Sequence, residues 1–446
     1  MSELIPAAPT AGSEFAAFVA IDWADQKHYW KLYSPNSAQT EHGELPNTPE
    51  AIEVWAVELG RRFPGRPIAV ILEQKRGPLV YQLSKYVHLV LFPAHPTTLA
   101  RYRQAFCPSG SKNDPGDTGL LLEILLHHRD HLRRLDPDTP ETRLLQILSE
   151  QRRKWVDEKT ALSNGLTAWL KSYFPQALDW FDDIDSPLAL DFLERWPALE
   201  QLQCTKPNAL WQFFTDHNSR SEQRIQARIK AIYQAVRATH DRALEVAGPQ
   251  VTAGFVRQLK ALQTSIDALN EQIRRAEAEH PDAPLFAAVP GAGPALRPRL
   301  IVAFGTQRER YATAAELQAA SGIAPVHKQS GNTRSTHFRQ ACPKFLRQTF
   351  HEFAAQSIKK SQWARACYDY QREDLHKSHH AAVRVVAFKW IRVLFACWKT
   401  RTPYDEATYL RALERHHSPL TRCLDPHTQL VWKEVAGFQK LGMENA

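Results

Sequence analysis

Four carboxylates occupy positions from which they could share metal ions. Asp22 ends the apolar stretch FVAIDW, Glu73 ends the apolar stretch AVILEQ, and Asp114 and Asp117 stand three residues apart in KNDPGDTGLL. Carboxylate oxygens suit hard divalent cations such as Mg²⁺, which keep coordination positions open for water or phosphate oxygens. Two such ions can activate the attacking group and stabilise the leaving oxygen of a phosphodiester. These residue types therefore indicate metal-assisted phosphodiester chemistry, provided that the fold brings them together.

Each carboxylate also has an ordinary structural explanation. Asp114 and Asp117 open an apolar helical run, where a cap and a first-turn acid stabilise a helix by about 1 kcal/mol. Asp22 could be a turn residue, and Glu73 could pair with the basic residues that follow it. The order favours a shared site: an acid follows the first strand, a second acid follows a later strand, and an Asp-x-x-Asp helix comes after both.

A possible nucleophile lies far away in SGIAPVHKQSGNTRSTHFR. Ser330 is followed by Gly331, and a glycine lets a tight loop bring a hydroxyl close to phosphate. Attack by this serine would give a phosphoserine bond that conserves the energy for rejoining a strand. Lys328, Arg334 and Arg339 could neutralise the phosphoryl oxygens. A Ser-Gly pair in a basic loop is also an ordinary turn, so the residues alone leave both explanations open.

The elements that would position the carboxylates form an α/β pattern between residues 18 and 138. Strands that alternate with helices form a sheet whose ligands bind near the strand ends. We expect strands at 18–23, 27–34, 67–74 and 87–94, and helices at 48–63, 79–86 and 114–131.

The pattern becomes helical from residue 139 to 282. Apolar residues recur every three or four positions from Leu259 through Leu262 to Ile273, as in a coiled-coil seam. We expect a helical spacer with a dimerising role. Residues 1–17 are expected to be a flexible tail, and residues 406–446 an extension of unknown role.

Residues 283–405 are predicted to form a mostly helical C-terminal domain. VPGAGP lies between two helical stretches, which is the shape of a helix-hairpin-helix-like element. Its backbone N–H groups near Gly291 and Gly293 could contact a nucleic-acid phosphate, with Arg297 and Arg299 adding charge. The apolar stretch RVVAFKWIRVLFACW is interpreted as a buried core helix, and HKSHH as a solvated or phosphate-facing polar patch.

The overall composition permits a nucleic-acid partner. The 446-residue chain has a net charge of +8 and a pI near 9.1, a moderate basic excess. The six cysteines are scattered without a CxxC pair, which argues against a zinc ribbon or a disulfide framework. We find no apolar run long enough to cross a bilayer. A cytoplasmic protein without a membrane partner is therefore expected.

The chain resembles the DEDD-type insertion-sequence transposases of the "IS one-ten" family, which includes Piv-like DNA invertases. The resemblance is carried by three segments: AIDWADQKHYW, ILEQ and KNDPGDT. The resemblance implies a RuvC-like N-terminal domain with RNase H topology. The family's helix motif usually reads Lys-Thr-Asp-x-x-Asp-Ala; here Lys112 is kept, whereas Asn113 and Thr118 replace the Thr and the Ala. Lys112 is assigned to nucleic-acid contact. The implied tetrad for Mg²⁺, or Mn²⁺, is Asp22, Glu73, Asp114 and Asp117.

VPGAGP and the segment 320–354 are similar to the family's C-terminal transposase domain, whose serine nucleophile lies in a Gly-x-x-Pro…Ser-Gly stretch. The matching residue is Ser330, since Ser321 precedes the Gly-x-x-Pro element. The resemblance covers residues 18–405. It implies a homo-oligomer, up to a tetramer, that cuts and rejoins donor and target DNA through a phosphoserine intermediate. A structured noncoding RNA, the bridge RNA, would guide it.

Two other functions remain open from the sequence. A metal-only endonuclease of the Holliday-junction type would use water as the nucleophile and would not need Ser330. A non-catalytic nucleic-acid-binding protein would use the four acids only as helix caps and salt-bridge partners. The ordered set of four acids counts against this second alternative.

Overall fold

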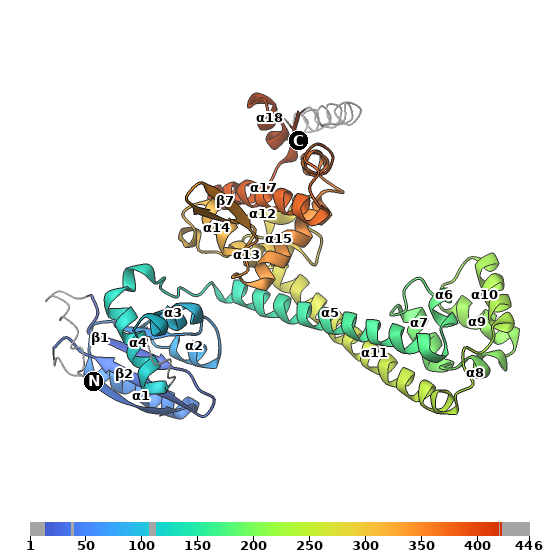
Figure 1. Ribbon diagram of the computed structural model, residues 1–446, viewed down its shortest axis with the longest axis horizontal. Helices are drawn as coiled ribbons and strands as arrows, with labels where there is room; N and C mark the ends of the chain where they lie inside the picture. Colours follow the sequence, from blue (N-terminus) through green and yellow to red (C-terminus); the bar gives the residue numbers. More distant parts are fainter. Residues whose placement is uncertain (1–13, 37–39, 107–112, 419, 422–446) are drawn as a thin grey trace. The chain divides into compact units, whose positions relative to one another are not determined.

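The computed structural model describes residues 14–36, 40–106, 113–418 and 420–421 (Figure 1). Contacts divide the chain into two compact units, residues 1–137 (unit 1) and 138–446 (unit 2). Lys112 and the ends of the chain, including most of the predicted extension 406–446, lie outside the described residues.

Unit 1 is built on a five-stranded mixed sheet with the order β3-β2-β1-β4-β5. The strands β1 to β3 form an antiparallel meander, whereas β4 and β5 run parallel to β1. The two parallel strands are buried along almost their whole length, because helices cover both faces of the sheet. The bounds are β1 Ala17–Asp22, β2 Lys27–Tyr33, β3 Thr40–Pro46, β4 Ile68–Leu72 and β5 Leu89–Pro93.

Two apolar cores lie on opposite faces of this sheet. One packs against α1 (Pro49–Arg62) and α2 (Pro78–Leu83), and the other against α3 (Pro96–Phe106) and α4 (Asp114–His127). A 3₁₀ turn, η1 (Arg129–His131), follows α4. The side chain of Thr48 caps α1 by accepting from the Ala51 N–H at 3.3 Å, as its position predicted.

The sequence prediction missed β3 and α3 in unit 1. The β3 segment was expected to be a polar connection because it has one buried residue, Leu45, and lies at the edge of the sheet. The α3 helix also has one buried residue, Leu99. Neither segment therefore shows the apolar periodicity on which the prediction depended.

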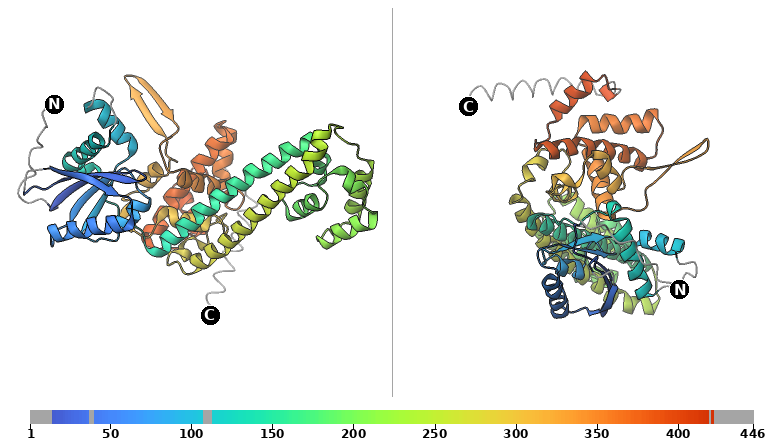
Figure 2. Two further views of the ribbon diagram at one scale, coloured as in Figure 1. Left: turned by 90° about the horizontal axis from the view of Figure 1, so that it is seen from below. Right: turned by 90° about the vertical axis from the view of Figure 1, so that its left-hand side faces the viewer.

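Unit 2 contains two long helices, α5 (Pro140–Tyr173) and α11 (Arg242–Ala278), which lie side by side (Figures 1 and 2). They have 34 and 37 residues, so each is about 50 Å long. Five short helices lie between them in the sequence and form an aromatic-rich core with one end of the pair. These are α6 Gln176–Trp180, α7 Pro187–Arg195, α8 Leu199–Gln203, α9 Pro207–Asp216 and α10 Glu222–Gln234.

The predicted coiled-coil seam is largely occupied within the chain. Leu269 and Ile273 share a core with Leu145 of α5, and Leu259 shares another with Leu166 of α5. Spacing alone predicts that a helix has a partner, but it does not say which chain supplies that partner.

The C-terminal part of unit 2 forms a helical core around α17. Trp363, Trp390 and Trp398 are fully buried, and α17 supplies much of this core, as its apolar sequence predicted. No helix within the described ranges is long and apolar enough to cross a membrane. The elements are α12 Ala283–Ala287, α13 Arg297–Phe304, η2 Arg308–Arg310, α14 Ala314–Ala320, β6 Val326–Ser330, β7 Thr333–His337, α15 Lys344–Ser357, α16 Gln362–Asp369, η3 Tyr370–Asp374, α17 His379–Thr400 and α18 Glu406–Arg415.

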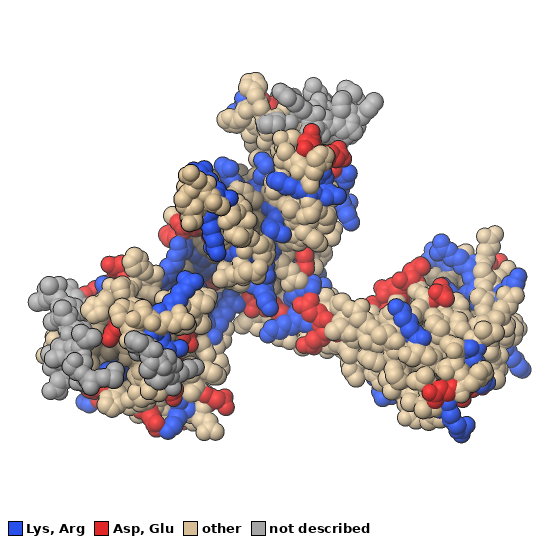
Figure 3. Space-filling model, viewed as in Figure 1, with Lys and Arg blue, Asp and Glu red and all other residues tan. Residues whose placement is uncertain are grey.

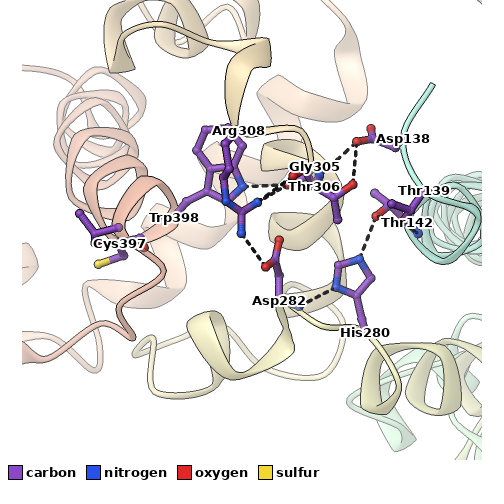
Figure 4. Close-up of polar contacts among 11 residues, drawn as sticks. Asp138, Thr139, Thr142, His280, Asp282, Gly305, Thr306, Arg308, Cys397 and Trp398 are labelled. Carbon is purple, nitrogen blue, oxygen red and sulfur yellow. Dashed lines mark hydrogen bonds and ion pairs between the residues drawn. The ribbon is translucent and has the colours of Figure 1, made fainter. Parts of the chain in front are cut away.

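A buried polar network ties this core to the start of α5 (Figure 4). Nη2 of Arg308 donates to Oδ1 of Asp282 at 2.6 Å. Nδ1 of His280 accepts from the Asp282 N–H at 3.1 Å, and its Nε2 lies 2.9 Å from Oγ1 of Thr142. Because Nδ1 is an acceptor, the ring is neutral with its proton on Nε2. Burial lowers the pKa of His280, although the nearby Asp282 carboxylate opposes the shift.

Candidate active site

Asp22 and Glu73 are brought side by side by the sheet register. Ile21 of β1 pairs with Leu72 of β4 in parallel, so the next residues, Asp22 and Glu73, follow at the same level. Both carboxylates are half-buried. Side chains alternate along a strand, and Ala20 and Ile71, two residues before the acids, belong to the core under α3 and α4. Asp22 and Glu73 therefore lie on the face of the sheet that α4 covers.

The first turn of α4 lies toward the same end of β1. Arg129, just after the end of α4, has its guanidinium carbon 5.1 Å from the centre of the Phe15 ring, just before β1. The two elements therefore run in opposite directions. The 14 residues of α4 and the six of β1 have similar lengths, about 20 Å. Asp114 and Asp117 are in the first turn of α4, which therefore lies near the end of β1 that carries Asp22.

Asp117 is buried and paired with an arginine. Its side chain is on the inner face of α4 and is 3% exposed. From α3, Nε of Arg103 donates to Oδ1 of Asp117 at 2.7 Å, and Nη2 of Arg103 lies 2.6 Å from the same oxygen. Sequence reasoning missed Arg103, because its partner is 14 residues away on another helix.

Asp114 is exposed and does not cap α4, which corrects one expectation. The cap is Asn113, whose Oδ1 accepts from the Gly116 N–H at 2.7 Å. Asn113 stands where the resembling family usually has Thr, and both residue types cap helices well. Asp114 is the first helical residue, so its carboxylate is available for other contacts.

The four carboxylates suit a divalent cation by their chemistry, but their side chains are not gathered around one point. Among the residues that the structure describes, no group of three or more His, Cys, Asp or Glu side chains is placed to hold a metal ion. Arg103 neutralises Asp117. Both contacts of Arg103 are to Oδ1 of Asp117, so an ion that used all four carboxylates would compete with Arg103 for Asp117 or bind its other oxygen, Oδ2.

Ser330 is at the tip of a β-hairpin in unit 2, where the sequence predicted a loop. It pairs with Thr333 of β7, so the turn consists of Gly331 and Asn332. Gly331 has φ +56°, and a glycine at the first turn position is typical of the type II′ turn that joins twisted strands. The prediction missed these strands because neither has a buried residue.

Figure 2, left, shows the hairpin as two strands that project from the helices of unit 2. Its residues are exposed on both faces and include basic side chains. Lys328 and Arg334 are exposed, like Ser330 itself. Arg339, beyond the hairpin, is half-buried, and its Nε donates to the Ala324 carbonyl at 3.3 Å. Lys328 lies on the same face of the hairpin as Ser330 and is available to a phosphate near it, whereas Arg334 pairs with Gln329 and lies on the opposite face. Arg339 also anchors the hairpin.

The VPGAGP turn has mainly a packing role. Gly291 has φ +83°, and a Cβ there would lie 2.7 Å from the Ser357 nitrogen, so only glycine fits. Gly293 is exposed. Arg297 pairs with Glu277, which is buried.

The sequence prediction for Arg299 is corrected by its burial. The residue is 3% exposed. Its Nε donates to Oγ1 of Thr349 at 3.0 Å, and its Nη1 donates to Oε2 of Glu352 at 2.6 Å. Burial lowers the pKa of Arg299, and Glu352 opposes this shift. Arg299 therefore stabilises the α13–α15 packing and does not present charge to a nucleic acid.

Two family models match the chain. Residues 19–175 match the DEDD-type IS110 model, described as a transposase, and residues 283–369 match the model described as the transposase IS116/IS110/IS902 family. The chain belongs to the IS110 family of transposases. The two matched regions of this IS110-family chain contain Asp22, Glu73, Asp114 and Asp117 in the first and Ser330 in the second.

Whole-chain comparisons agree with this family. A mini-circle protein of Streptomyces coelicolor, named as a transposase for IS117, is 26% identical over 397 residues, covering 87% of this chain and 95% of its own. A 42 kDa protein of the insertion element IS900 from Mycobacterium paratuberculosis is 26% identical over 307 residues, covering 67% of this chain and 74% of its own.

Proposed function

We propose that this IS110-family transposase cuts and rejoins the DNA of its mobile element through a covalent bond to Ser330. The observation that carries the proposal is the place of Ser330 at the tip of an exposed hairpin, with Lys328 two residues away on the same face. An exposed hydroxyl with a basic neighbour can reach a phosphodiester whose negative oxygens that neighbour neutralises.

The chemistry at Ser330 is a pair of transesterifications. Oγ of Ser330 attacks the phosphorus and loses its proton, the bond from phosphorus to one sugar oxygen breaks, and that oxygen leaves as a hydroxyl. In the second step a strand hydroxyl attacks the phosphoserine, and Ser330 regains its proton. Lys328 would bind the phosphoryl oxygens in both steps, and Arg334, on the other face of the hairpin, would contact the nucleic acid nearby. The number of phosphodiester bonds is conserved, so rejoining needs no other energy source.

We further propose that Asp22, Glu73, Asp114 and Asp117 bind Mg²⁺ in an RNase H-like unit. The sheet order, with an antiparallel meander followed by two parallel strands, supports this topology, and the register of Asp22 and Glu73 supports a shared site. A bound Mg²⁺ would supply Lewis-acid stabilisation of the phosphoryl oxygens. The carboxylates would hold the ion, and Arg103 would hold Asp117 in its absence.

A structured guide RNA and an assembly of two to four copies complete the proposal. The net charge of +8 suits a nucleic-acid partner. One stretch of the long helix pair keeps apolar side chains partly exposed in a groove of about 610 Å³, which a second copy could cover. Trp155, Leu162 and Leu262 are among the residues that line it.

The test is a covalent trap. The protein, with any co-purified RNA retained, is incubated with Mg²⁺ and labelled DNA carrying the element end, and products are separated on denaturing gels. We expect a protein–DNA adduct that mass spectrometry places on Ser330 and that is absent in Ser330→Ala. The adduct should not form when the protein is treated with ribonuclease before the DNA is added. Ser335→Ala, which removes a hydroxyl from the same hairpin, is the control and should form the adduct. Cleaved DNA without an adduct, unchanged in Ser330→Ala, would contradict the proposal and favour the metal-only nuclease.

A further inference from the structure

A cationic pocket lies in unit 2 at the foot of the Ser330 hairpin. It has a volume of about 350 Å³ and lies between Ile323, just before β6, and Phe338, just after β7, on one side and the helices α15 and α17 on the other. Its polar lining consists of Lys344, Arg347, Gln348, His351, His380 and Arg384. No carboxylate of the described residues lines it, so the pocket has the charge of an anion site.

Two of the arginines are held by one aromatic ring. The guanidinium carbons of Arg347 and Arg384 lie 4.8 and 4.5 Å from the centre of the Phe338 ring. An arginine over an aromatic face is attracted by the ring quadrupole. Phe338 is nevertheless 37% exposed, which is unusual for a ring that only fills a core. The Phe338 ring therefore holds two positively charged side chains close together beside the pocket.

Three basic groups of this pocket have no acidic partner among the described residues. Within the part of the chain that the structure describes, Lys344, Arg347 and Arg384 take part in no salt bridge. Arg347 donates to the Arg339 carbonyl at 3.3 Å, so it also fixes the base of the hairpin. Burial lowers the pKa of Arg384, and the charge of Arg347 adds to this shift. An anion between the two guanidinium groups would relieve their repulsion.

Two histidines, His351 and His380, also line the pocket. Nδ1 of His380 lies 3.4 Å from Nε2 of His351. Burial lowers the pKa of His351, and the neighbouring His380 and Arg384 lower it further. When both rings are neutral and hydrogen-bonded to each other, one of them keeps an N–H that can donate to another acceptor. Figure 3 shows Lys and Arg gathered over the part of unit 2 that carries the hairpin.

We propose that this pocket binds a backbone phosphate of a nucleic-acid strand, at a position away from the phosphate that Ser330 attacks. The inference rests on the proposed function. Ser330 is at the far end of β6, and Phe338 follows the five residues of β7, so about 17 Å of strand separate the two. In a duplex at about 3.4 Å per base pair, this corresponds to about five base pairs. Arg347, Arg384 and Lys344 bind the phosphate, and Phe338 is a positioning residue.

The test measures binding apart from cleavage. All proteins carry Ser330→Ala, and the probes are fluorescein-labelled DNA of the element end, as duplex and as single strand, and a single-stranded RNA of the same sequence. Anisotropy titrations at several salt concentrations give Kd and its salt slope. The added changes are Arg384→Gln and Phe338→Leu. The control is Arg392→Gln, an exposed arginine two turns further along α17. Thermal unfolding checks that each variant folds.

We expect Arg384→Gln to bind about tenfold more weakly and to lower the salt slope by about one. Phe338→Leu should lower the slope as well, although it removes no charge, because Arg347 and Arg384 lose the ring that holds them. Arg392→Gln should match the parent, and the probe that shows the larger effect identifies the strand. If folded Arg384→Gln keeps the salt slope of the parent on every probe, the proposal that this pocket binds a phosphate is wrong. A missing Ser330 adduct in the unsubstituted protein would instead overturn the proposed function, since this binding assay needs no cleavage.

Discussion

At the residue scale, the contact that most constrains the proposed chemistry is the one between Arg103 and Asp117. Both side chains are largely buried, with 19% and 4% exposed. Removing one partner of such a pair leaves an uncompensated charge and costs more than the net stabilisation of the pair. In this IS110-family protein the arginine therefore has two effects: it stabilises unit 1 and it occupies a carboxylate that the proposed metal site needs.

This contact gives a prediction for Arg103→Gln. We expect the free energy of unfolding to fall by about 3 kcal/mol, because Asp117 loses its counter-charge. Mn²⁺ should restore much of the lost stability by binding the released carboxylate of Asp117. The Mn²⁺ concentration needed to stabilise Arg103→Gln should be lower than the concentration needed to stabilise the unsubstituted protein. Thermal unfolding of the full chain with and without Mn²⁺ measures both effects.

The control for Arg103→Gln is the double variant Arg103→Gln with Asp117→Asn. It lacks the uncompensated charge, so it should be more stable than Arg103→Gln and should not respond to Mn²⁺. An equal Mn²⁺ response in both variants would show that Asp117 is not a metal ligand.

At the element scale, the polar network between the start of α5 and the α11–α12 junction depends on a neutral His280. Its Nδ1 accepts a backbone hydrogen bond, and protonation there would break that bond. Burial lowers the pKa of His280 in the folded protein. When the pH falls below about 6.5, the ordinary pKa of histidine, the unfolded state therefore binds more protons than the folded state. Stability contributed by this group is therefore present above that pH and is lost as pH falls.

We predict that the melting temperature of the protein falls as pH is lowered from 7 to 5. In His280→Gln the melting temperature at pH 7 should be lower, by the equivalent of about 1 kcal/mol for lost hydrogen bonds. The pH dependence should also be weaker in this variant, because one proton-binding group is gone. Scanning calorimetry across this range tests both statements. An identical pH dependence in the two proteins would contradict the neutral, buried state of His280.

Elements with strong apolar periodicity could be predicted from the sequence, and those without it could not. The strands β1, β4 and β5 and the helix α17 each bury several residues and were anticipated near their observed bounds. The hairpin of β6 and β7 has none, so its strands have no sequence signal beyond Gly331. Burial creates the pattern that prediction detects.

Some residues of the candidate site could be predicted from local sequence patterns, and others could not. The acids at strand ends were found because each follows an apolar run, and the register of β1 and β4 then places two of them together. Arg103 and the pocket around Phe338 could not be found, because they depend on contacts between helices whose mutual packing no local pattern encodes. The burial of Arg299 has the same cause: its partner Glu352 is on α15, 53 residues away.

At the scale of the whole molecule, the proposed assembly of copies would use the groove on the long helix pair. Leu262 belongs to the predicted seam, yet it is only partly buried and lines the groove beside Trp155. We predict that Leu262→Glu lowers the oligomeric state, because a charge in an apolar interface costs several kcal/mol. Sedimentation at several protein concentrations, with circular dichroism as the folding check, measures this.

The matched control for Leu262→Glu is Ala268→Glu, an exposed position on the same helix. It adds the same charge outside the groove and should leave the sedimentation profile unchanged. If folded Leu262→Glu sediments like the unsubstituted protein, the groove is not an interface between copies.

The exposure of the Ser330 hairpin on both faces has a consequence for the cell that carries this element. A two-stranded hairpin without a core behind it is only marginally stable, so a docked nucleic acid would supply much of its order. Under the proposed function, Ser330 would be held firmly for attack only on a strand that the protein also binds elsewhere. Random contacts with the host chromosome would then pass without breakage, and the element could multiply without killing its host.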